Sequence, residues 1–391
     1  MVMEPQSDST PSFPGDGYPA LPIEKILQVG DLEATEPSET LTPLSGTEGE
    51  VIGLSRQGRE IHGFRLGSGP RKISLIGGCH ADEPVGPDML RRLTEFLVTR
   101  APDHPLLRWA TWYLVPHVNP DGASDNQGWA KRRLPTTDHL GQEDQGYEIA
   151  PYLRGVVREL PGDDMEWGFP LEATDRDARP ENLAVADFLR PGAPFSLHAS
   201  FHSMGFAAGP WFLLEPGWVD ATQELRSTLT TRVESMGYLL HDVDRKGEKG
   251  FHRIGPGFCT RPDSRAMAAH FIEKGDAETA AAFRPSSMEW VGSLGGDPLT
   301  LVSEMPLFLL PTQIPDLPDA PPHPTGTEGR LAFLAWTHRR MKDLTPEDFR
   351  LEVKRFGLRP MPLRDQMRLQ LGFLDEGLRA ISTRNTPLAG P

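Results

Sequence analysis

Residues 73–83 read Ile73-Ser74-Leu75-Ile76-Gly77-Gly78-Cys79-His80-Ala81-Asp82-Glu83, and this stretch decides how the rest of the chain is interpreted. An apolar run that ends in two glycines is typical of a buried strand that stops abruptly. The imidazole of His80 and the carboxylate of Glu83 follow at that strand end. Zinc accepts both ligand types, and a catalytic zinc takes three protein ligands and leaves one position for water. The alternative is a surface loop whose acid caps the next helix, so a third ligand must be sought downstream.

Size and composition limit the classes of protein that need to be considered. The chain has 391 residues and a net charge of -15. This length favours one large domain with an appendage. The 39 glycines and 39 prolines indicate long loops between elements. The negative charge argues against nucleic acid and anionic membranes as partners.

The chain lacks the usual marks of export and membrane insertion. Its first residues show no basic and apolar segments of a secretory signal, and no apolar run approaches the roughly 18 residues of a membrane helix. Cys79 and Cys259 are too few for a disulfide framework. We therefore expect a cytoplasmic protein with reduced cysteines and no membrane partner, in which Cys79 packs behind the loop of His80.

The order of apolar segments predicts the fold class. A hairpin over 51–66 precedes an alternation of strands and helices, which indicates an α/β fold with a mixed, mostly parallel twisted sheet and helices on both faces. Sites in such sheets form at the carboxyl ends of the strands. The predicted strands are 72–77, 111–116, 195–202 and 299–304, and the predicted helices are 87–99, 180–189, 219–236 and 264–283.

Three regions follow from these patterns. Residues 1–45 are predicted to be a flexible N-terminal segment, because residues 1 to about 20 are rich in Ser, Pro, Gly and Asp, although a short helix is expected near Ile23–Leu27. Residues 46–322 form the expected catalytic domain. Residues 323–391 show helical apolar spacing and are expected to form a C-terminal helical appendage, which either packs on the domain or makes a homo-oligomer. Its predicted helices are 328–342, 346–356 and 363–382.

The third ligand is sought on the strand at 195–202. His198 and His202 lie on the same side of it because side chains alternate along a strand. His202 stands at the strand end, whereas His198 lies about 13 Å back along the strand. An ordinary hydrogen-bonded histidine remains the alternative for either position. We favour His202 as the ligand and keep His198 as the second candidate.

In the order and spacing of its motifs, the chain resembles the zinc carboxypeptidase family (the funnelin-type metallocarboxypeptidases). The family pattern is a strand ending in His-x-x-Glu, a later strand ending in His-Ser, and a C-terminal strand that carries a catalytic Glu. Two accessory motifs also match, in the opening hairpin and after the strand at 111–116. The matching segments are His80–Glu83, His202-Ser203, Ser303–Ile314, Gly53–Arg59 and Val118–Gly122.

The resemblance implies a zinc centre with one Zn2+ per chain. His80, Glu83 and His202 would be the ligands, and the pKa of a water in the fourth position would fall to about 7. Glu304 would act as the general base beside that water. The apolar residues that flank Glu304 favour a half-buried position over an exposed acid. Asp82 is expected to support the loop.

The substrate-holding residues depart from the family pattern. The family has an arginine for the oxyanion after Asn-Pro-Asp-Gly, whereas this chain reads Trp129-Ala130-Lys131-Arg132-Arg133. Arg132 is our first candidate and Arg133 the second, with a solvated basic cluster as the alternative. Arg158 matches the arginine of the family's Asn-Arg pair as a substrate-binding residue, although Val157 replaces the asparagine. The family's proton-donating tyrosine has no counterpart in residues 280–303.

These observations predict a zinc-dependent hydrolase that cleaves a C-terminal peptide or amide bond in a peptide or small amide substrate. The missing asparagine and tyrosine leave open a deacylase or amidase of the same fold, acting on an acylated amino acid or modified peptide. A second alternative is a non-catalytic zinc-binding interaction protein. The presence of all three ligands together with Glu304 argues against that last interpretation.

Overall fold

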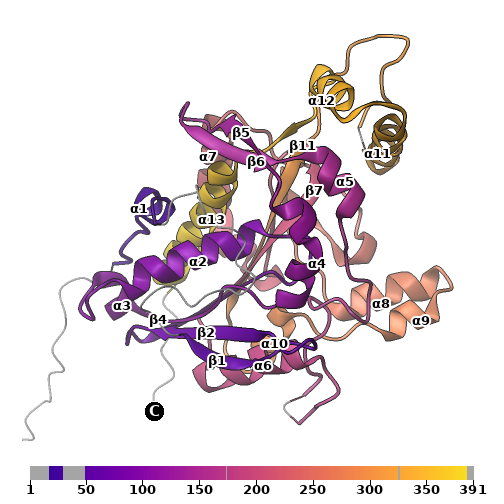
Figure 1. Ribbon diagram of the computed structural model, residues 1–391. Helices are drawn as coiled ribbons and strands as arrows, with labels where there is room; N and C mark the ends of the chain where they lie inside the picture. Colours follow the sequence, from indigo (N-terminus) through magenta and orange to yellow (C-terminus); the bar gives the residue numbers. More distant parts are fainter. Residues whose placement is uncertain (1–16, 30–48, 173, 325, 385–391) are drawn as a thin grey trace, which may run out of the picture.

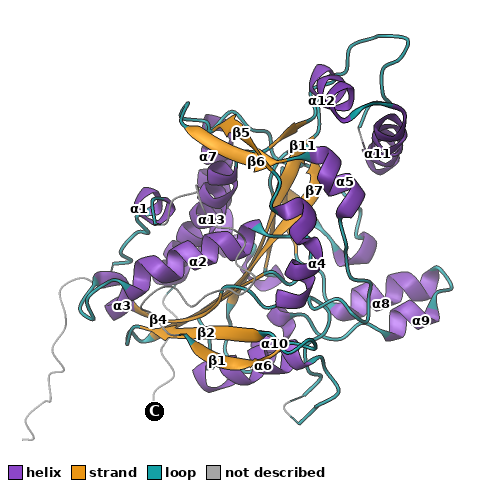
Figure 2. Ribbon diagram, in the orientation of Figure 1, coloured by secondary structure: helices purple, strands orange, loops and turns teal. Residues whose placement is uncertain are grey.

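A twisted ten-stranded mixed sheet organises this computed structural model, which describes residues 17–29, 49–172, 174–324 and 326–384 (Figures 1 and 2). Its strands lie in the order β1 (Glu50–Leu54), β2 (Glu60–Leu66), β4 (Ala110–Val115), β3 (Arg71–Gly77), β7 (Leu197–Ala207), β11 (Leu299–Leu309), β8 (Trp211–Leu214), β10 (Phe258–Thr260) and β9 (Arg253–Gly255), and β12 (Arg359–Pro360) pairs with β11. A separate hairpin joins β5 (Arg133–Thr137) to β6 (Glu143–Tyr147).

The centre of the sheet is parallel. β4, β3, β7 and β11 are consecutive parallel neighbours, while the outer pairs β1–β2, β2–β4 and β11–β8 are antiparallel. The predicted fold class is therefore confirmed. β3 stops beside Phe201 of β7, so His202 is the first residue of β7 beyond the end of its neighbour.

Helices cover both faces of the sheet (Figure 2). Leu75 belongs to a core with α2, α7 and α13, and Ile76 to a core with α6 and α10, because successive side chains of a strand point to opposite faces. The helices are α1 (Ile23–Leu27), α2 (Val85–Val98), α3 (Pro105–Trp109), α4 (Pro120–Ala130), α5 (Ile149–Gly155), α6 (Pro180–Leu189), α7 (Gln223–Ser235), α8 (Ser264–Glu273), α9 (Ala277–Ala281), α10 (Ser287–Ser293), α11 (Gly326–Asp343), α12 (Pro346–Arg355) and α13 (Leu363–Thr383).

Several element boundaries differ from the predicted ones. β7 and β11 continue five residues past the predicted strand ends, because the two strands go on pairing with each other after β3 has stopped. The predicted helix over 264–283 is two helices that break at Gly275, whose φ of +78° is incompatible with a continuous helix. Residues 119–179, for which the sequence predicted no helix or strand, contain α4, α5 and the β5–β6 hairpin.

The C-terminal region divides differently from the prediction. α13 packs on β7 and β11 with most of its side chains buried, so it belongs to the core of the main domain. The predicted boundary at residue 322 therefore separates only α11 and α12, which lie at one end of the molecule (Figure 1). The apolar face of α13 is occupied by its own domain and is not available for self-association.

The N-terminal region differs as well. Residues 17–29, placed in the predicted flexible segment, pack on the domain: Tyr18 Oη donates to Asp375 Oδ1 at 2.7 Å, and Ile26 is fully buried. The rest of the predicted flexible segment, residues 1–16 and 30–45, lies outside the described residues. Among the described helices, none is both long and apolar enough to cross a membrane.

Candidate metal centre

The loop after β3 carries two of the predicted ligands to the edge of β7. Gly78 takes a φ of +76°, and a Cβ there would lie 2.8 Å from the ring of His117. Only glycine fits such a turn without strain. The start of α2 also approaches β7 closely, because a Cβ on Gly86 would lie 2.2 Å from the carbonyl oxygen of Phe201. These close approaches bring His80 and Glu83 next to His202.

The three predicted ligands present their donor atoms to one point. Nδ1 of His80 and Nδ1 of His202 lie 3.2 Å apart, and each lies 2.8 Å from a carboxylate oxygen of Glu83. Two nitrogens on one tetrahedral zinc, each about 2.0–2.1 Å from the metal, would be about 3.3 Å apart. Glu83 and His202 are almost fully buried. The ligand set therefore fits a zinc ion.

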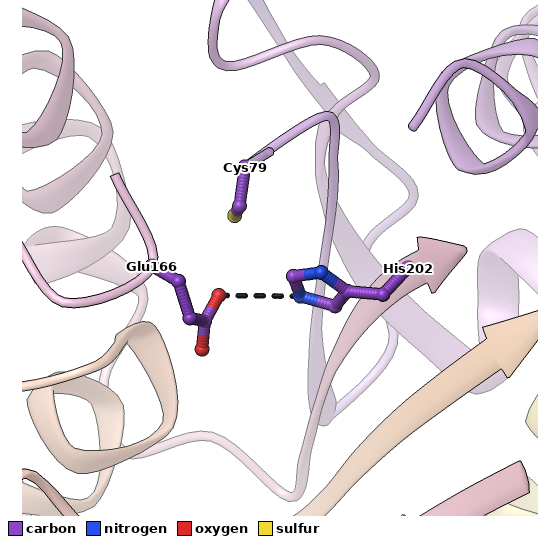
Figure 3. A group of neighbouring side chains, drawn as sticks. All are labelled: Cys79, Glu166 and His202. Atoms are coloured by element: carbon purple, nitrogen blue, oxygen red, sulfur yellow. Dashed lines mark ion pairs between the residues drawn. The ribbon is translucent and has the colours of Figure 1, made fainter. Parts of the chain in front are cut away.

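The far ring nitrogens of both histidines face acceptors. Nε2 of His80 lies 3.4 Å from Asp164 Oδ2. Nε2 of His202 lies 2.7 Å from Ser200 Oγ and 3.2 Å from Glu166 Oε2, the ion pair drawn in Figure 3. A proton held on Nε2 leaves the Nδ1 lone pair for a metal, and such outer partners fix the orientation of the ring. Both histidines are thus presented through the same nitrogen.

A second group of potential ligands shares His202. Cys79 and Glu166 lie near its ring (Figure 3), and Glu166 faces Nε2, whereas Glu83 faces Nδ1. Burial and the charge of Glu166 raise the pKa of the Cys79 thiol well above its ordinary value. On the other side of His202, His80 and Glu83 add an imidazole and a carboxylate, which is a donor set typical of a catalytic zinc. We therefore assign the metal to the side of Glu83 and regard Cys79 as a packing residue, as the sequence predicted.

The local charges favour a cation between the three ligands. Burial opposes a charge on His202, but Glu83 and Glu166 outweigh it and raise the pKa of His202 to about 10. The pKa of His80 is likewise raised by Glu83 and Asp164 against the effect of burial. Burial opposes the charge on Glu83 too, yet the two histidines hold its pKa well below the usual range. These three carboxylates surround a buried position that attracts positive charge.

Glu304 lies next to the ligands. It stands opposite His202 in the parallel pair β7–β11 and opposite Trp211 in the antiparallel pair β11–β8. It is partly buried, as predicted, and lines a cavity of about 510 Å3 that also contains His80 and His202. Burial and the charge of Glu83 raise the pKa of Glu304 to about 7. A carboxyl group with such a pKa can exchange protons near neutral pH.

Arg158 reaches the same position from the segment after α5. Its Nη2 lies 3.2 Å from Glu83 Oε1 and 3.1 Å from His80 Nδ1. Asn126 of α4 positions that segment, because it hydrogen-bonds both the backbone of Val157 and the carbonyl of Ala81. The guanidinium is about half exposed to the cavity. Arg158 can therefore contact a substrate beside the ligands.

The structure does not place the other predicted arginine there. Arg132 is exposed just after α4 and does not line the cavity of His80 and Glu304. Arg133, the second candidate, lies over the ring of Tyr147 at 3.8 Å, on a different surface. α4 ends at Ala130, and the chain then enters the β5–β6 hairpin, which carries both arginines away from the ligands. The prediction of Arg132 as the oxyanion partner was wrong in this geometry.

His198 is a structural residue. It is fully buried four residues before His202 on β7, with Nδ1 2.7 Å from Ser74 Oγ and Nε2 3.0 Å from Ser287 Oγ. Burial and the charge of Arg261 lower its pKa to about 3. Both nitrogens have partners, so His198 has no free donor for a metal.

Three residues of the site escaped the sequence reasoning. Asp164 and Glu166 come from a loop without periodicity, and only their Asp-x-Glu spacing after Arg158 could have drawn attention. Tyr152 of α5 lines the cavity and supplies a phenol that the segment 280–303 lacks. A Cβ at Gly205 would lie 2.4 Å from Tyr152 Oη, so glycine is needed there for the phenol to approach.

One further cluster of potential metal ligands lies outside this cavity. Asp138, His139 and Asp365 come close enough to hold a metal. However, Asp365 already accepts hydrogen bonds from His139, Tyr238 and Arg368. Protein donors therefore satisfy its carboxylate, and the group joins α13 to the rest of the fold.

Sequence comparisons match part of the chain to one family. Residues 45–211 match the family model described as zinc carboxypeptidase. The matched range contains His80, Glu83, Arg158 and His202, and Glu304 lies beyond it. The chain is 35% identical over 146 residues to a protein of Talaromyces stipitatus named "Inactive metallocarboxypeptidase ecm14", and 33% identical over 100 residues to carboxypeptidase B of Astacus astacus.

These alignments are partial. The first covers 33% of this chain and 22% of the relative, and the second covers 24% and 33%. The matched region therefore spans no more than a third of either relative's length. Among solved structures, carboxypeptidase A from Helicoverpa armigera superposes with a TM-score of 0.46 at 13% identity, over 86% of this chain and 69% of that chain.

Proposed function

We propose that this chain, whose residues 45–211 match the zinc carboxypeptidase family model, is a zinc-dependent hydrolase that cleaves a C-terminal peptide or amide bond. The family supports a metal-dependent hydrolase in general terms, and the proposal adds the residues and the reaction. The observation that carries it is the convergence of His80 Nδ1, His202 Nδ1 and the Glu83 carboxylate on one buried point beside Glu304.

His80, Glu83 and His202 would hold the metal. When bound, zinc supplies a Lewis acid that polarises a carbonyl group and lowers the pKa of water. Asp164 and Glu166 keep the two imidazoles in the orientation that presents Nδ1. Gln370 of α13 donates to the carbonyl oxygen of His202 at 3.3 Å, so the buried C-terminal helix supports the same strand.

Glu304 would be the general base. A carboxylate in this position takes a proton from the attacking water and returns it to the leaving amine. Its pKa of about 7 suits both steps near neutral pH. Arg158 would offer its guanidinium to the oxyanion or to the substrate carboxylate, since cations aimed at developing negative charge lower the barrier. Tyr152 adds a phenol on the same cavity wall.

Two other functions remain candidates because particular observations favour them. The absence of an asparagine beside Arg158 weakens the recognition of a terminal carboxylate and favours a deacylase of the same architecture. The word "Inactive" in the name of one relative favours metal binding without turnover. The presence of Glu304 with a pKa near neutrality favours turnover over metal binding without turnover.

One experiment separates the three. The zinc-loaded protein is incubated with a peptide library and with N-acylated amino acids, and the products are read by mass spectrometry. Loss of single C-terminal residues supports the peptidase, and release of acyl groups supports the deacylase. In parallel, Glu304→Gln is expected to keep its zinc and to lose turnover by about 10²–10⁴-fold. Full activity of this variant, or no product from the wild type, would refute the proposal.

A further inference from the structure

The cavity of Glu304 continues to a wall that holds three cations. Arg245 lies on the segment before η4 (Glu248–Gly250), Lys249 lies within η4, and Arg330 comes from α11. All three are partly buried and line the same cavity as His80 and His202. α11 thus contributes to the wall of the site, although it lies in the helical extension. We name Arg245, Lys249 and Arg330 the distal cations.

None of the distal cations forms an ion pair in the described part of the chain, although the charge of Glu248 partly offsets that of Arg245 at Lys249. The two other arginines of the cavity do have one: Arg158 contacts Glu83, and Arg261 contacts Glu215 at 2.7 Å. Burial and the charge of Arg245 lower the pKa of Lys249 and of Arg330. Three like charges that are brought together without a counter-ion repel one another, so this arrangement gains free energy when an anion binds.

Aromatic rings fix the most central of the three. The Arg245 guanidinium lies 4.5 Å from the ring centre of Phe251 and 5.2 Å from that of Trp211, two rings that contact each other. Trp211 is also the residue opposite Glu304 in the sheet. An arginine on aromatic faces keeps its donors directed outward, ready for a planar acceptor. The scaffold that positions Glu304 therefore also positions Arg245.

The rest of this wall is apolar. Met204, Met267, Met288 and Leu334 line the same cavity as the ligands and the distal cations. The cavity volume of about 510 Å3 accommodates a group the size of an amino-acid residue. A cavity that combines apolar side chains with cations matches a short aliphatic stem that ends in a carboxylate.

From these observations we infer that the cavity selects substrates whose residue next to the cleaved bond carries an acidic side chain, as glutamate and aspartate do. The inference rests on the proposed function for the position of the cleaved bond. The chain as a whole carries a net charge of -15 and repels anions at long range. A local cationic wall is therefore needed to draw an acidic group into the cleft.

The test compares substrates that differ only in charge. Acylated dipeptides ending in Glu, Gln, Leu or Lys are offered to the zinc-loaded protein, and kcat/KM is measured for each. We expect Glu to be preferred over its isostere Gln by at least about tenfold. In the double variant Arg245→Gln/Arg330→Gln that ratio should fall to near one. The matched control is Arg265→Gln, which removes an exposed charge of α8 outside the cavity and should keep the preference.

A binding measurement keeps this test separate from that of the proposed function. N-benzoylglutamate and N-benzoylglutamine are titrated by calorimetry into zinc-loaded Glu304→Gln protein, with and without the double variant. A preference for benzoylglutamate of at least about tenfold that disappears in the double variant supports the inference, even if no peptide is cleaved. Equal binding of the two compounds would overturn the inference, and so would a Glu/Gln selectivity that survives the double variant. In either case, peptide cleavage by the wild type would still support the proposed function.

Discussion

The ligand group and the distal cations lie in one cavity but are built in opposite ways. Around His80, Glu83 and His202 every charge has a partner: each imidazole is flanked by carboxylates, and Glu83 meets Arg158. Among the described residues, the distal cations form no ion pair, and Arg245 and Lys249 lie over aromatic rings. The carboxylates around the ligand group attract a buried cation, whereas the distal cations attract an anion. The contrast indicates that the two ends serve the metal and the substrate separately.

Removing a ligand should abolish metal binding at the ligand end of the cavity. We expect His202→Ala to lower zinc affinity by more than the roughly 10–100-fold typical of outer partners, because the metal loses a direct bond. Zinc per chain, measured after dialysis against a weak chelator, should fall from near one to near zero. Unchanged zinc would place the metal elsewhere. The ratio of benzoylglutamate to benzoylglutamine binding should survive, since the distal cations are intact.

Arg158 stands between the two ends and tests whether they are linked through substrate. Arg158→Ala should reduce kcat/KM by about 10²–10³-fold because it removes a cation from the reacting carbonyl or carboxylate. Zinc content should stay near one per chain. Arg132→Ala is the matched control and should leave kcat/KM unchanged, since that side chain is exposed outside the cavity. A larger loss in Arg132→Ala than in Arg158→Ala would reverse the assignment.

Glu166 tests whether the outer carboxylates matter to the metal. Glu166→Gln keeps the shape of the side chain but removes the charge that faces His202 Nε2 at 3.2 Å. We expect zinc affinity to fall by about 10–100-fold. Competition with a zinc-binding dye measures this directly. An affinity equal to that of the wild type would mean that Ser200 alone orients the ring.

His198 gives a smaller effect on folding. Its pKa is about 3 in the folded chain, against about 6.5 when unfolded, so the fold favours the neutral ring. The stabilisation is complete above pH 6.5 and is lost as the pH falls toward 3; between pH 7 and 5 this amounts to about 2 kcal/mol. Urea unfolding at both pH values should show that loss in the wild type and a smaller one in His198→Asn. Parallel losses in both proteins would contradict this role.

The metal side of the site was predictable from the sequence because strands fix its residues. The apolar run before Gly77 locates one strand end, and the pattern around His202 and Glu304 locates two neighbouring strands. Parallel pairing then brings all of them to one edge. His198 was separable from His202 by the same reasoning, since four residues along a strand are about 13 Å.

The substrate side was not predictable, because its residues come from loops and helices whose paths depend on tertiary contacts. Arg132 failed because α4 ends two residues before it and a hairpin follows. Asp164 and Glu166 lie in a segment without periodicity. Lys249 and Arg330 come from two segments that are far apart in the sequence. The apolar stripe of α13 predicted that the helix packs, and the structure shows that it packs on its own domain, which was one of the two alternatives.

The central claim is that zinc binds between His80, Glu83 and His202 rather than against Cys79. X-ray absorption at the zinc edge of the loaded protein tests it most directly. The claim predicts a first shell of nitrogen and oxygen only, at about 2.0–2.2 Å, with two imidazole rings. A sulfur scatterer at about 2.3 Å would place the metal with Cys79 and Glu166 on the other side of His202 and contradict the claim.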